Sequence, residues 1–338
     1  MLHCIINPAS SSGSGLRQWE AIEQCLIANG AEYEAHFSDA AHSIEDIAAS
    51  LTDPSGKTEP LEDRTLLILG GDGSMNGAVN GIRDFAHTKI GFVPIGSGND
   101  LALDLGLPSD QEALIRTILK EEVVRECDIG RVTFHNRTEL LDPFTHMPVE
   151  AASAAESGAP YTRLFNISAG IGFDAACCQG AEGSRFKKLL NRIRMGQLVY
   201  LYNAVKLILT APMKPAEIIF TNKKTNRRTR LIKRMLFAVC MNHCYEGGGF
   251  RFCPDASASD GMLDTLMAGD LNRLNFFRIF PTAYDGGHLK YQGVNAERSN
   301  TVEIRTALPL WVHTDGEVTC KSSHITVDLL PEKLRMIL

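Results

Sequence analysis

The stretch TLLILGGDGSMN, residues 65–76, is the part of this chain that says most about its fold. Its first five residues, Thr65–Leu69, form the continuous apolar run that is typical of a strand buried on both faces. The glycine turn Gly70–Gly73 follows directly, and the next residues predict a helix from about Met75 to Phe85. A buried strand that passes through a glycine turn into a helix is the repeating unit of a parallel sheet covered by helices.

The same alternation continues on both sides of this stretch. Apolar runs predict strands at Leu2–Asn7, Glu32–Phe37 and Ile90–Pro94. Apolar residues at helical spacing fill the intervals, and Gly30 and Asp39 are suited to end the first helix and to cap the second. In such sheets ligands bind beyond the carboxyl ends of the strands, where the glycine loops of this chain fall.

The alternation stops near residue 130. An Ala-, Ser-, Glu- and Pro-rich stretch within residues 136–162 indicates an exposed insertion, and a basic helix is predicted from about Ser184 to Leu209. After Pro215, short strands separated by turns indicate a second, mainly antiparallel region.

We therefore expect an α/β protein of two domains. Residues 1–130, completed by the C-terminal segment 325–338, are expected to form an N-terminal parallel-sheet nucleotide-binding domain. Residues 131–324 are expected to form a C-terminal, mainly antiparallel β domain that carries the basic helix and receives the acceptor. The active site is expected in the cleft between the two domains.

The composition is that of a globular protein, with 44% hydrophobic and 22% charged residues in 338. No apolar run approaches the roughly 18 residues that cross a bilayer, and Met1–Cys4 is interpreted as the start of a strand rather than of a signal peptide. Nine scattered cysteines indicate reduced thiols in a cytoplasmic protein, which would be peripheral to the inner face of the membrane. Cys240, His243, Cys244 and Cys253 leave a zinc site open, although their spacing matches none of the usual ligand pairs.

The net charge of −6 is unevenly distributed. Residues 181–234 hold 14 Lys and Arg against two acidic residues, a net charge of +12, so the remainder carries −18. Such a segment favours an anionic partner, and we expect it to dock on an anionic membrane surface. A solvated helix face with a polar hairpin is the alternative. No nucleic acid partner is expected, because aromatic residues are not interleaved for base stacking.

Three loops rich in Gly, Ser and Asn suggest the chemistry of the protein. They are Asn7–Gly15, Gly70–Asn76 and Pro94–Asp100, and each follows a predicted strand. Glycines let the backbone approach a ligand closely, while hydroxyls and helix N-termini donate to phosphate oxygens. Asp72 is a lone carboxylate among glycines, which suits a ligand to Mg²⁺. The chain has neither a Walker A lysine pattern nor Gly-x-Gly-x-x-Gly after the first strand.

These loops carry a family resemblance. Gly70-Gly71-Asp72-Gly73-Ser74 followed by Asn76 resembles the Gly-Gly-Asp-Gly-Thr motif of the diacylglycerol kinase catalytic domain, and residues 94–102 and Asn7-Pro8 resemble two further loops of that family. Other pieces follow the family's order over nearly the whole chain: Asp128-Ile129-Gly130, Asn166 to Asp174, Gly247-Gly248-Gly249, Pro254 to Leu263 and Thr314-Asp315-Gly316-Glu317. The chain is most similar to the bacterial soluble lipid kinases, with sphingosine kinases and NAD kinases as more distant relatives.

The resemblance implies an ATP site at the ends of the first strands. Its lining is expected to come from Asn7, Pro8, Ala9, Ser10, Ser11, Ser38, Gly70, Gly71, Asp72, Gly73, Ser74, Met75, Asn76 and Ser97. Within this set, the resemblance places Asp72 at Mg²⁺ and the phosphates. Across the cleft, it implies that Glu317 is the general base and that Asp315 assists metal binding or substrate orientation.

Two further groups of residues are implied by the resemblance. Ser257 and Met262 through their backbone carbonyls, and Asp260 through its side chain, are expected to match a structural Mg²⁺ site that some bacterial relatives have. Asp100 and Asp128 are expected in a polar network under the active site.

Some positions depart from the family pattern. Ser74 stands where Thr is usual, Leu103 where bacterial relatives often have Arg, and Asn203 where some relatives have Lys. The last two leave open whether Asp100 and Asp128 form a charge-paired network.

The turn near the C-terminus also allows simpler interpretations. Asp315-Gly316 suits a plain type I′ hairpin turn, in which Glu317 would be solvated. His313 beside it is either catalytic or, as is commoner in an alternating strand, structural.

Taken together, the motifs predict a lipid kinase that uses ATP and Mg²⁺ to phosphorylate a hydroxyl of a membrane lipid in phospholipid biosynthesis, with a diacylglycerol-like acceptor. Phosphoryl transfer depends mainly on positioning and charge neutralisation, which glycine loops and carboxylates provide. A kinase for a soluble substrate such as NAD and a nucleotide-binding regulator without turnover are the alternatives. The identity of the lipid and the oligomeric state, including a homodimer, stay open.

Overall fold

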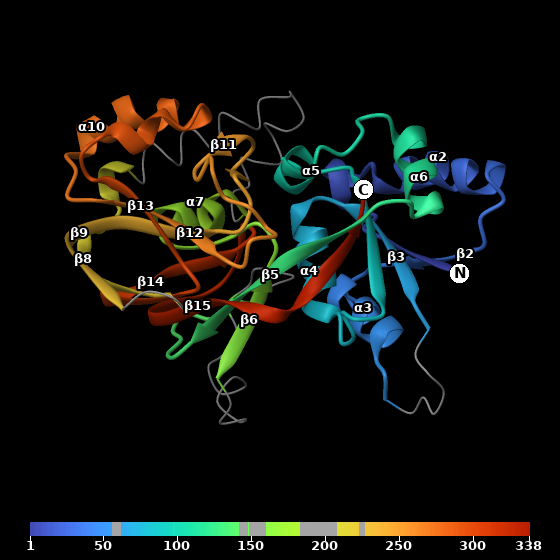
Figure 1. Ribbon diagram of the computed structural model, residues 1–338, viewed down its shortest axis with the longest axis horizontal. Coiled ribbons are helices and arrows are strands. Elements are labelled where there is room, and N and C mark those ends of the chain that lie inside the picture. The colour runs from blue at the N-terminus through green and yellow to red at the C-terminus, as the bar shows by residue number, and fades with distance from the viewer. Residues whose placement is uncertain (56–61, 97, 142–147, 149–159, 183–207, 223–226) are drawn as a thin grey trace.

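The computed structural model describes residues 1–55, 62–96, 98–141, 148, 160–182, 208–222 and 227–338 (Figure 1). The chain forms two lobes. The helices and strands of the first third lie together on one side, and most of the later strands lie on the other (Figure 1).

The first lobe is a sheet with helices on both faces. Its strand order is β4-β3-β1-β2, and neighbouring strands in this order run parallel. All seven residues of β3 are buried, because α2 and α6 pack on one face of the sheet and α3 and α4 on the other. The elements are β1 (Leu2–Ile6), α1 (Ser10–Gly13), α2 (Gly15–Ala28), β2 (Tyr33–Phe37), α3 (Ile44–Thr52), β3 (Arg64–Gly70), α4 (Asp72–Gly81), β4 (Thr88–Pro94), α5 (Asp100–Leu105) and α6 (Gln111–Lys120).

Two helix starts differ from the sequence prediction. Helix α4 begins at Asp72, inside the glycine loop, rather than near Met75. The carboxylate in the first turn favours this earlier start, because helix N-termini attract negative charge. Helix α3 is capped by Ser43 and not by Asp39, since the Ser43 side chain and the Asp46 carboxylate each accept the backbone N–H of the other.

The second lobe is built from antiparallel strands with helices packed against them. One core cluster lies among β5, β7, β8, β9, β14 and β15, and another lies between β9, β12 and α10. The elements are β5 (Val124–Phe134), β6 (Tyr161–Phe165), β7 (Ser168–Gly172), α7 (Phe173–Glu182), β8 (Lys214–Thr221), β9 (Arg228–Met241), β10 (Tyr245–Glu246), β11 (Phe250–Arg251), β12 (Leu263–Gly269), α10 (Arg273–Ile279), η2 (Phe280–Tyr284), η3 (Gly287–Lys290), β13 (Val294–Ser299), β14 (Thr301–Thr314) and β15 (Glu317–Ile337).

Strand β15 connects the lobes. It begins at the turn after β14 with the pair Thr314↔Glu317, and it ends beside β4 with the parallel pairs Arg335↔Lys89 and Met336↔Ile90 (Figure 1). Its pairing with β5 shifts register between Leu329 and Lys333, around Pro331, which has no backbone N–H to donate. Residues 325–328 of β15 still pair with β14 of the second lobe, and the strand joins the sheet of the first lobe at its end, at Arg335 and Met336.

Several general expectations can be compared with this structure. The mixed α/β architecture with an antiparallel C-terminal region is confirmed. All nine cysteines are free thiols, as expected. In the described ranges, no helix combines the length and the apolar character needed to cross a membrane. Most of the predicted basic helix and most of the 136–162 insertion lie outside the described residues.

Candidate active site

Loops at the carboxyl ends of β1, β3 and β4 meet at one place. The Asn7 side chain donates to the Ser74 Oγ over 3.1 Å, which ties the first loop to the start of α4. Gly71 and Gly96 approach so closely that a Cβ on Gly96 would lie 2.7 Å from the Gly71 Cα. Main-chain groups rather than side chains therefore form this edge of the sheet, which suits close approach by phosphate oxygens.

Asp72 lies in the first turn of α4 and faces the start of α5. Its carboxylate accepts the backbone N–H groups of Asp100 at 3.0 Å and of Leu101 at 3.4 Å. Burial raises the pKa of Asp72 to about 6, and the charges of Asp100 and Asp315 add to the rise against these two hydrogen bonds. An ionised Asp72 would therefore be stabilised by a cation.

Glu317 approaches the same loop from the second lobe. It is the first residue of β15, directly after the Asp315-Gly316 turn, whose φ angles are 51° and 87°. A Cβ on Gly73 would lie 2.2 Å from Glu317 Oε1, so the carboxylate contacts the backbone beside Asp72 and only glycine fits there. The structure thus brings Glu317 of the second lobe to the glycine loop that bears Asp72 of the first lobe.

The Asp315 carboxylate joins three parts of the chain. Oδ1 accepts the N–H groups of Ile167 at 2.8 Å and Ser168 at 3.0 Å. Oδ2 accepts the Asn166 N–H at 2.8 Å and the Asn76 side-chain amide at 2.9 Å. Burial raises the pKa of Asp315, and these hydrogen bonds oppose the rise. With two donors on each oxygen, Asp315 is suited to orient the turn before Glu317 rather than to bind metal.

His313 lies under the same turn and is 1% exposed. Its Nδ1 accepts the Gly316 N–H at 3.1 Å, and its Nε2 lies 3.1 Å from Asp174 and 3.3 Å from Glu246. Burial lowers the pKa of His313, but the Asp174 hydrogen bond and the Glu246 charge outweigh it and raise it to about 9. A second ring proton, on Nδ1, would break the Gly316 hydrogen bond. The turn therefore favours the neutral ring, whereas the carboxylates favour the charged ring.

Sequence reasoning left His313 between a catalytic and a structural role, and it did not identify Glu246. Burial raises the pKa of Glu246 to about 7. Nothing local marked this residue, because it comes from the short strand β10, far from the turn in sequence.

Asp100 and Asp128 do not form one network in the described part of the chain. Asp100 accepts the N–H groups of Gly248 at 2.9 Å and Gly249 at 2.8 Å, and burial raises its pKa. Asp128 is 1% exposed, pairs with Lys333 and accepts the Gly261 N–H. Lys333 therefore supplies the positive charge that is missing at Leu103, where relatives often have Arg. The sequence pattern did not reveal this role of Lys333.

The residues expected at a structural Mg²⁺ site lie in one turn. Ser257 Oγ lies 3.3 Å from Ser259 Oγ, and Asp260 accepts the Met262 N–H at 2.9 Å. The other oxygen of Asp260 pairs with Arg298. A metal ion at Asp260 would lie beside the positive charge of this guanidinium, which disfavours its binding.

The cysteines and histidine considered for zinc are not gathered around one point. His243 Nδ1 lies 2.6 Å from Asp104, and the Cys244 thiol donates to the same carboxylate at 2.7 Å. Cys240 and Cys253 contact Thr265 and the Asp264 carbonyl instead. Among the described residues, this set forms no metal cluster.

The remaining predicted ATP-site residues fall at the same edge of the sheet. Ser38 follows β2, is 9% exposed and donates its N–H to the Ile6 carbonyl at 2.9 Å. Pro8 and Ala9 form the turn into α1, and Ser10 and Ser11 are the first two residues of that helix. Ser97 lies outside the described residues.

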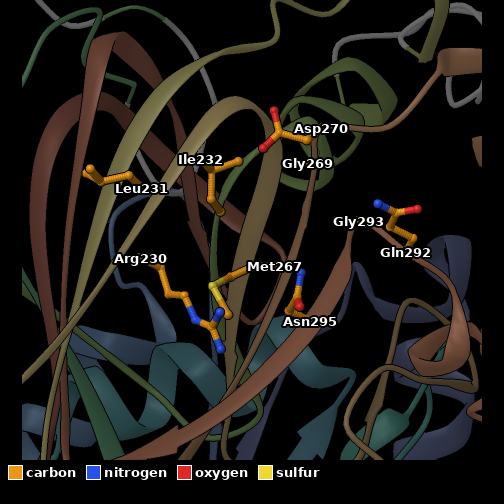
Figure 2. Close-up of a pocket in the computed structure, with 9 residues that line it drawn as sticks. All are labelled: Arg230, Leu231, Ile232, Met267, Gly269, Asp270, Gln292, Gly293 and Asn295. Carbon is orange, nitrogen blue, oxygen red and sulfur yellow. The ribbon is translucent and has the colours of Figure 1, made fainter.

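A separate hollow of about 280 Å³ lies in the second lobe (Figure 2). Residues of β9, β12 and the start of β13 line it, including Arg230, Met267 and Asn295 (Figure 2). None of the predicted site residues contributes to its lining.

Comparison with known proteins agrees with this arrangement. Residues 1–132 match the family described as "Diacylglycerol kinase catalytic domain", and residues 168–338 match the "YegS C-terminal NAD kinase beta sandwich-like domain". The chain belongs to the diacylglycerol kinase family. Membership of a kinase family supports a phosphotransferase.

Relatives of this family match over most of the chain. A diacylglycerol kinase of Mycobacterium tuberculosis is 25% identical over 94% of this chain and 88% of its own length. A diacylglycerol kinase of Bacillus subtilis is 25% identical over 78% of this chain and 74% of its own length. The crystal structure of a diacylglycerol kinase from Bacillus anthracis superposes with a TM-score of 0.64 at 16% identity, covering 99% of this chain and 96% of the other. This last likeness shows that the fold is shared.

Proposed function

We propose that this protein is an ATP-dependent lipid kinase that transfers the γ-phosphate of ATP to the hydroxyl of a diacylglycerol-like lipid, with Mg²⁺ as the metal. The observation that carries the proposal is the contact between Glu317 and Gly73, which places a carboxylate of the second lobe against the glycine loop that bears Asp72. Family membership supports a kinase, and the relatives named diacylglycerol kinase support a lipid acceptor.

The residues at the loop edge fit a nucleotide and a metal. Each Asp72 oxygen accepts one backbone N–H from the described residues. Each oxygen therefore keeps a lone pair that a metal ion can use. Asp72 would hold Mg²⁺ here, and the ion would supply positive charge against the negative charge that develops during transfer. Main-chain groups around Gly71 and the hydroxyl of Ser74 would hold the phosphates in place.

Glu317 is the residue suited to take the proton of the acceptor hydroxyl. The alcohol is a weak nucleophile until its proton leaves, and a positioned base contributes roughly 10²–10⁴-fold to the rate. Asp315 and His313 hold the preceding turn from two sides, through the β6–β7 turn and through the Gly316 N–H. Glu317 is thereby fixed relative to the phosphate loops.

The proposal is tested by incubating the purified protein with labelled ATP, Mg²⁺ and either a panel of lipids or NAD, followed by mass spectrometry of the products. We expect phosphate on a lipid hydroxyl, and we expect Glu317→Gln to abolish it while Glu112→Gln, an exposed residue of α6, retains it. Phosphate on NAD alone would establish the soluble-substrate alternative. Hydrolysis of no ATP under any condition would favour a regulator without turnover.

We also propose that the basic strand β9 docks on an anionic membrane. At its N-terminal end Arg228, Arg230, Lys233 and Arg234 are exposed, and Leu231 among them is 76% exposed. Glu297 pairs with Arg228 and Arg230, so Lys233 and Arg234 are the better probes.

This docking is tested by sedimentation with anionic vesicles. Each basic residue near such a surface contributes about 1 kcal/mol, so Lys233→Glu/Arg234→Glu is expected to weaken binding by more than about tenfold at low salt. Lys120→Glu, on the other lobe and 64% exposed, is the matched control. Binding that is indifferent to salt and to the double reversal would exclude docking through β9.

A further inference from the structure

Three potential metal ligands meet at the edge of the first sheet, outside the proposed active site. His3 lies on β1, and Glu34 and His36 lie on β2, which is the edge strand. The register pairs His3 with Glu34, and strand alternation puts His36 on the same face as Glu34. One ligand atom of each residue lies within 4.8 Å of the other two.

The separations are those that one small cation would impose. His3 Nδ1 lies 3.4 Å from His36 Nε2 and 3.5 Å from Glu34 Oε2, and the latter two atoms are 3.8 Å apart. A tetrahedral Zn²⁺ with bonds of about 2.1 Å holds its ligands about 3.4 Å from one another. The three side chains therefore need only small adjustments to bind an ion between them.

The ligand types of the site also suit a metal. His3 and His36 each offer a ring nitrogen and Glu34 offers a carboxylate oxygen, which are groups that Zn²⁺ takes as ligands. The Glu34 side chain is 55% exposed, which leaves access for the ion and room for a water as fourth ligand. The nearby cation Arg64 is engaged elsewhere, since its guanidinium donates to the Leu51 carbonyl and pairs with Asp84.

A second cluster shows why proximity alone is not sufficient. Asp174, Glu246 and His313 are equally close, but His313 Nδ1 accepts the Gly316 N–H. A ring that accepts this N–H at Nδ1 carries its proton on Nε2, and a doubly protonated ring does so too, so Nε2 has no lone pair for a metal. No backbone N–H occupies a ring nitrogen of His3 or His36 among the described hydrogen bonds.

We propose that His3, Glu34 and His36 form a binding site for a divalent cation of the Zn²⁺ type. Imidazole nitrogens with one carboxylate favour zinc and its neighbours in the first transition row over Mg²⁺. A bound ion joins the edge strand β2 to β1. Ions that bind only the folded chain stabilise it by mass action, so the site also raises the thermal stability of the protein.

The test uses the full chain without a polyhistidine tag, titrated with Co²⁺ and followed by the visible absorption of tetrahedral Co²⁺. We expect one equivalent to bind, Zn²⁺ to displace it, and the melting temperature to rise in the presence of Zn²⁺. His3→Asn, His36→Asn and Glu34→Gln are each expected to weaken binding by at least about tenfold, because loss of even an outer partner of a metal ligand costs about 10–100-fold.

The matched control is His42→Asn, which alters a histidine that is 71% exposed and lies outside the cluster. It is expected to bind Co²⁺ as the unaltered chain does. Three results would overturn the proposal: no saturable binding, binding that survives both histidine substitutions, or the near-ultraviolet charge-transfer band of Co²⁺ bound to thiolate. The last would assign the metal to cysteine.

Discussion

Asp72 lies where a negative charge is unfavourable unless a cation accompanies it. Its pKa rises from 3.8 to about 6, chiefly through burial. The folded chain therefore binds this proton more tightly than the unfolded chain does. The resulting stabilisation is complete below about pH 4 and is lost as the pH rises through about 6.

At the residue scale, we predict that Asp72→Asn abolishes kinase activity and stabilises the fold at pH 7. The gain in the free energy of unfolding is expected to be about 1 kcal/mol, since removing the charge outweighs the weakening of one backbone hydrogen bond. Urea denaturation at pH 7 and pH 4 measures it, and the gain should vanish at pH 4. A variant less stable than the parent at pH 7 would contradict this account.

His313 permits a separation of its two roles. Asn at this position keeps an acceptor near Nδ1 for the Gly316 N–H, whereas Gln keeps a donor near Nε2 for Asp174. If the ring acts by positioning the turn before Glu317, His313→Asn retains kcat and His313→Gln loses about tenfold or more, because small displacements of a catalytic group are costly. The KM for ATP should be unchanged in both. Equal losses in kcat would mean that the acceptor at Nδ1 has no special role.

At the scale of elements, the important contact is between the first turn of α4 and the start of β15. These elements are far apart in sequence, and Asp315 also links them through Asn76 of α4. Two of the three glycines in helix α4 have different surroundings. A Cβ on Gly73 would collide with Glu317 Oε1 at 2.2 Å, whereas a Cβ on Gly77 would lie 3.5 Å from Ile44, an ordinary contact.

We predict that Gly73→Ala removes most of the activity and that Gly77→Ala does not. Alanine favours a helix over glycine by about 0.5–1 kcal/mol, so neither variant should unfold. The displaced Glu317 accounts for the loss in Gly73→Ala, which is expected to reach about 100-fold in kcat/KM. Steady-state kinetics with circular dichroism melting measures both effects. A fully active Gly73→Ala enzyme would show that catalysis does not depend on the position of Glu317 against Gly73.

At the scale of the whole molecule, β15 unites the lobes (Figure 1). Its far end carries Lys333, whose ammonium pairs with the buried Asp128. Asp128 also holds the turn at Gly261, so one carboxylate connects the shared strand, β5 and the loop before β12.

We predict that Lys333→Met destabilises the protein by about 3 kcal/mol, because it leaves a buried carboxylate without its partner. Asp128→Asn/Lys333→Met should recover part of this loss, since an amide is less costly to bury than an unpaired charge. Thermal and urea unfolding of the two variants provides the measurement. A double variant less stable than Lys333→Met would show that the ion pair is not the reason for the effect.

Local sequence patterns predicted the features that depend on residues close together in the chain. Thr65–Asn76 indicated the buried strand, the glycine turn and the helix, although the helix begins earlier than its apolar periodicity suggested. The pairing of Asp128 with Lys333 was not predicted, because it joins residues 205 positions apart. For the same reason Glu246 went unnoticed beside His313, and Asp260 was not expected to face Arg298.

The order of residues was enough to indicate the α/β class, the glycine loops, the lone carboxylate Asp72 and the acidic turn at Asp315. These features follow from periodicity and turn chemistry, which act over a few residues. The meeting of Glu317 with Gly73, the neutralisation of Asp128 and the grouping of His3 with His36 required the folded chain. Strand pairing and lobe packing bring distant residues together, and no local preference encodes those distances.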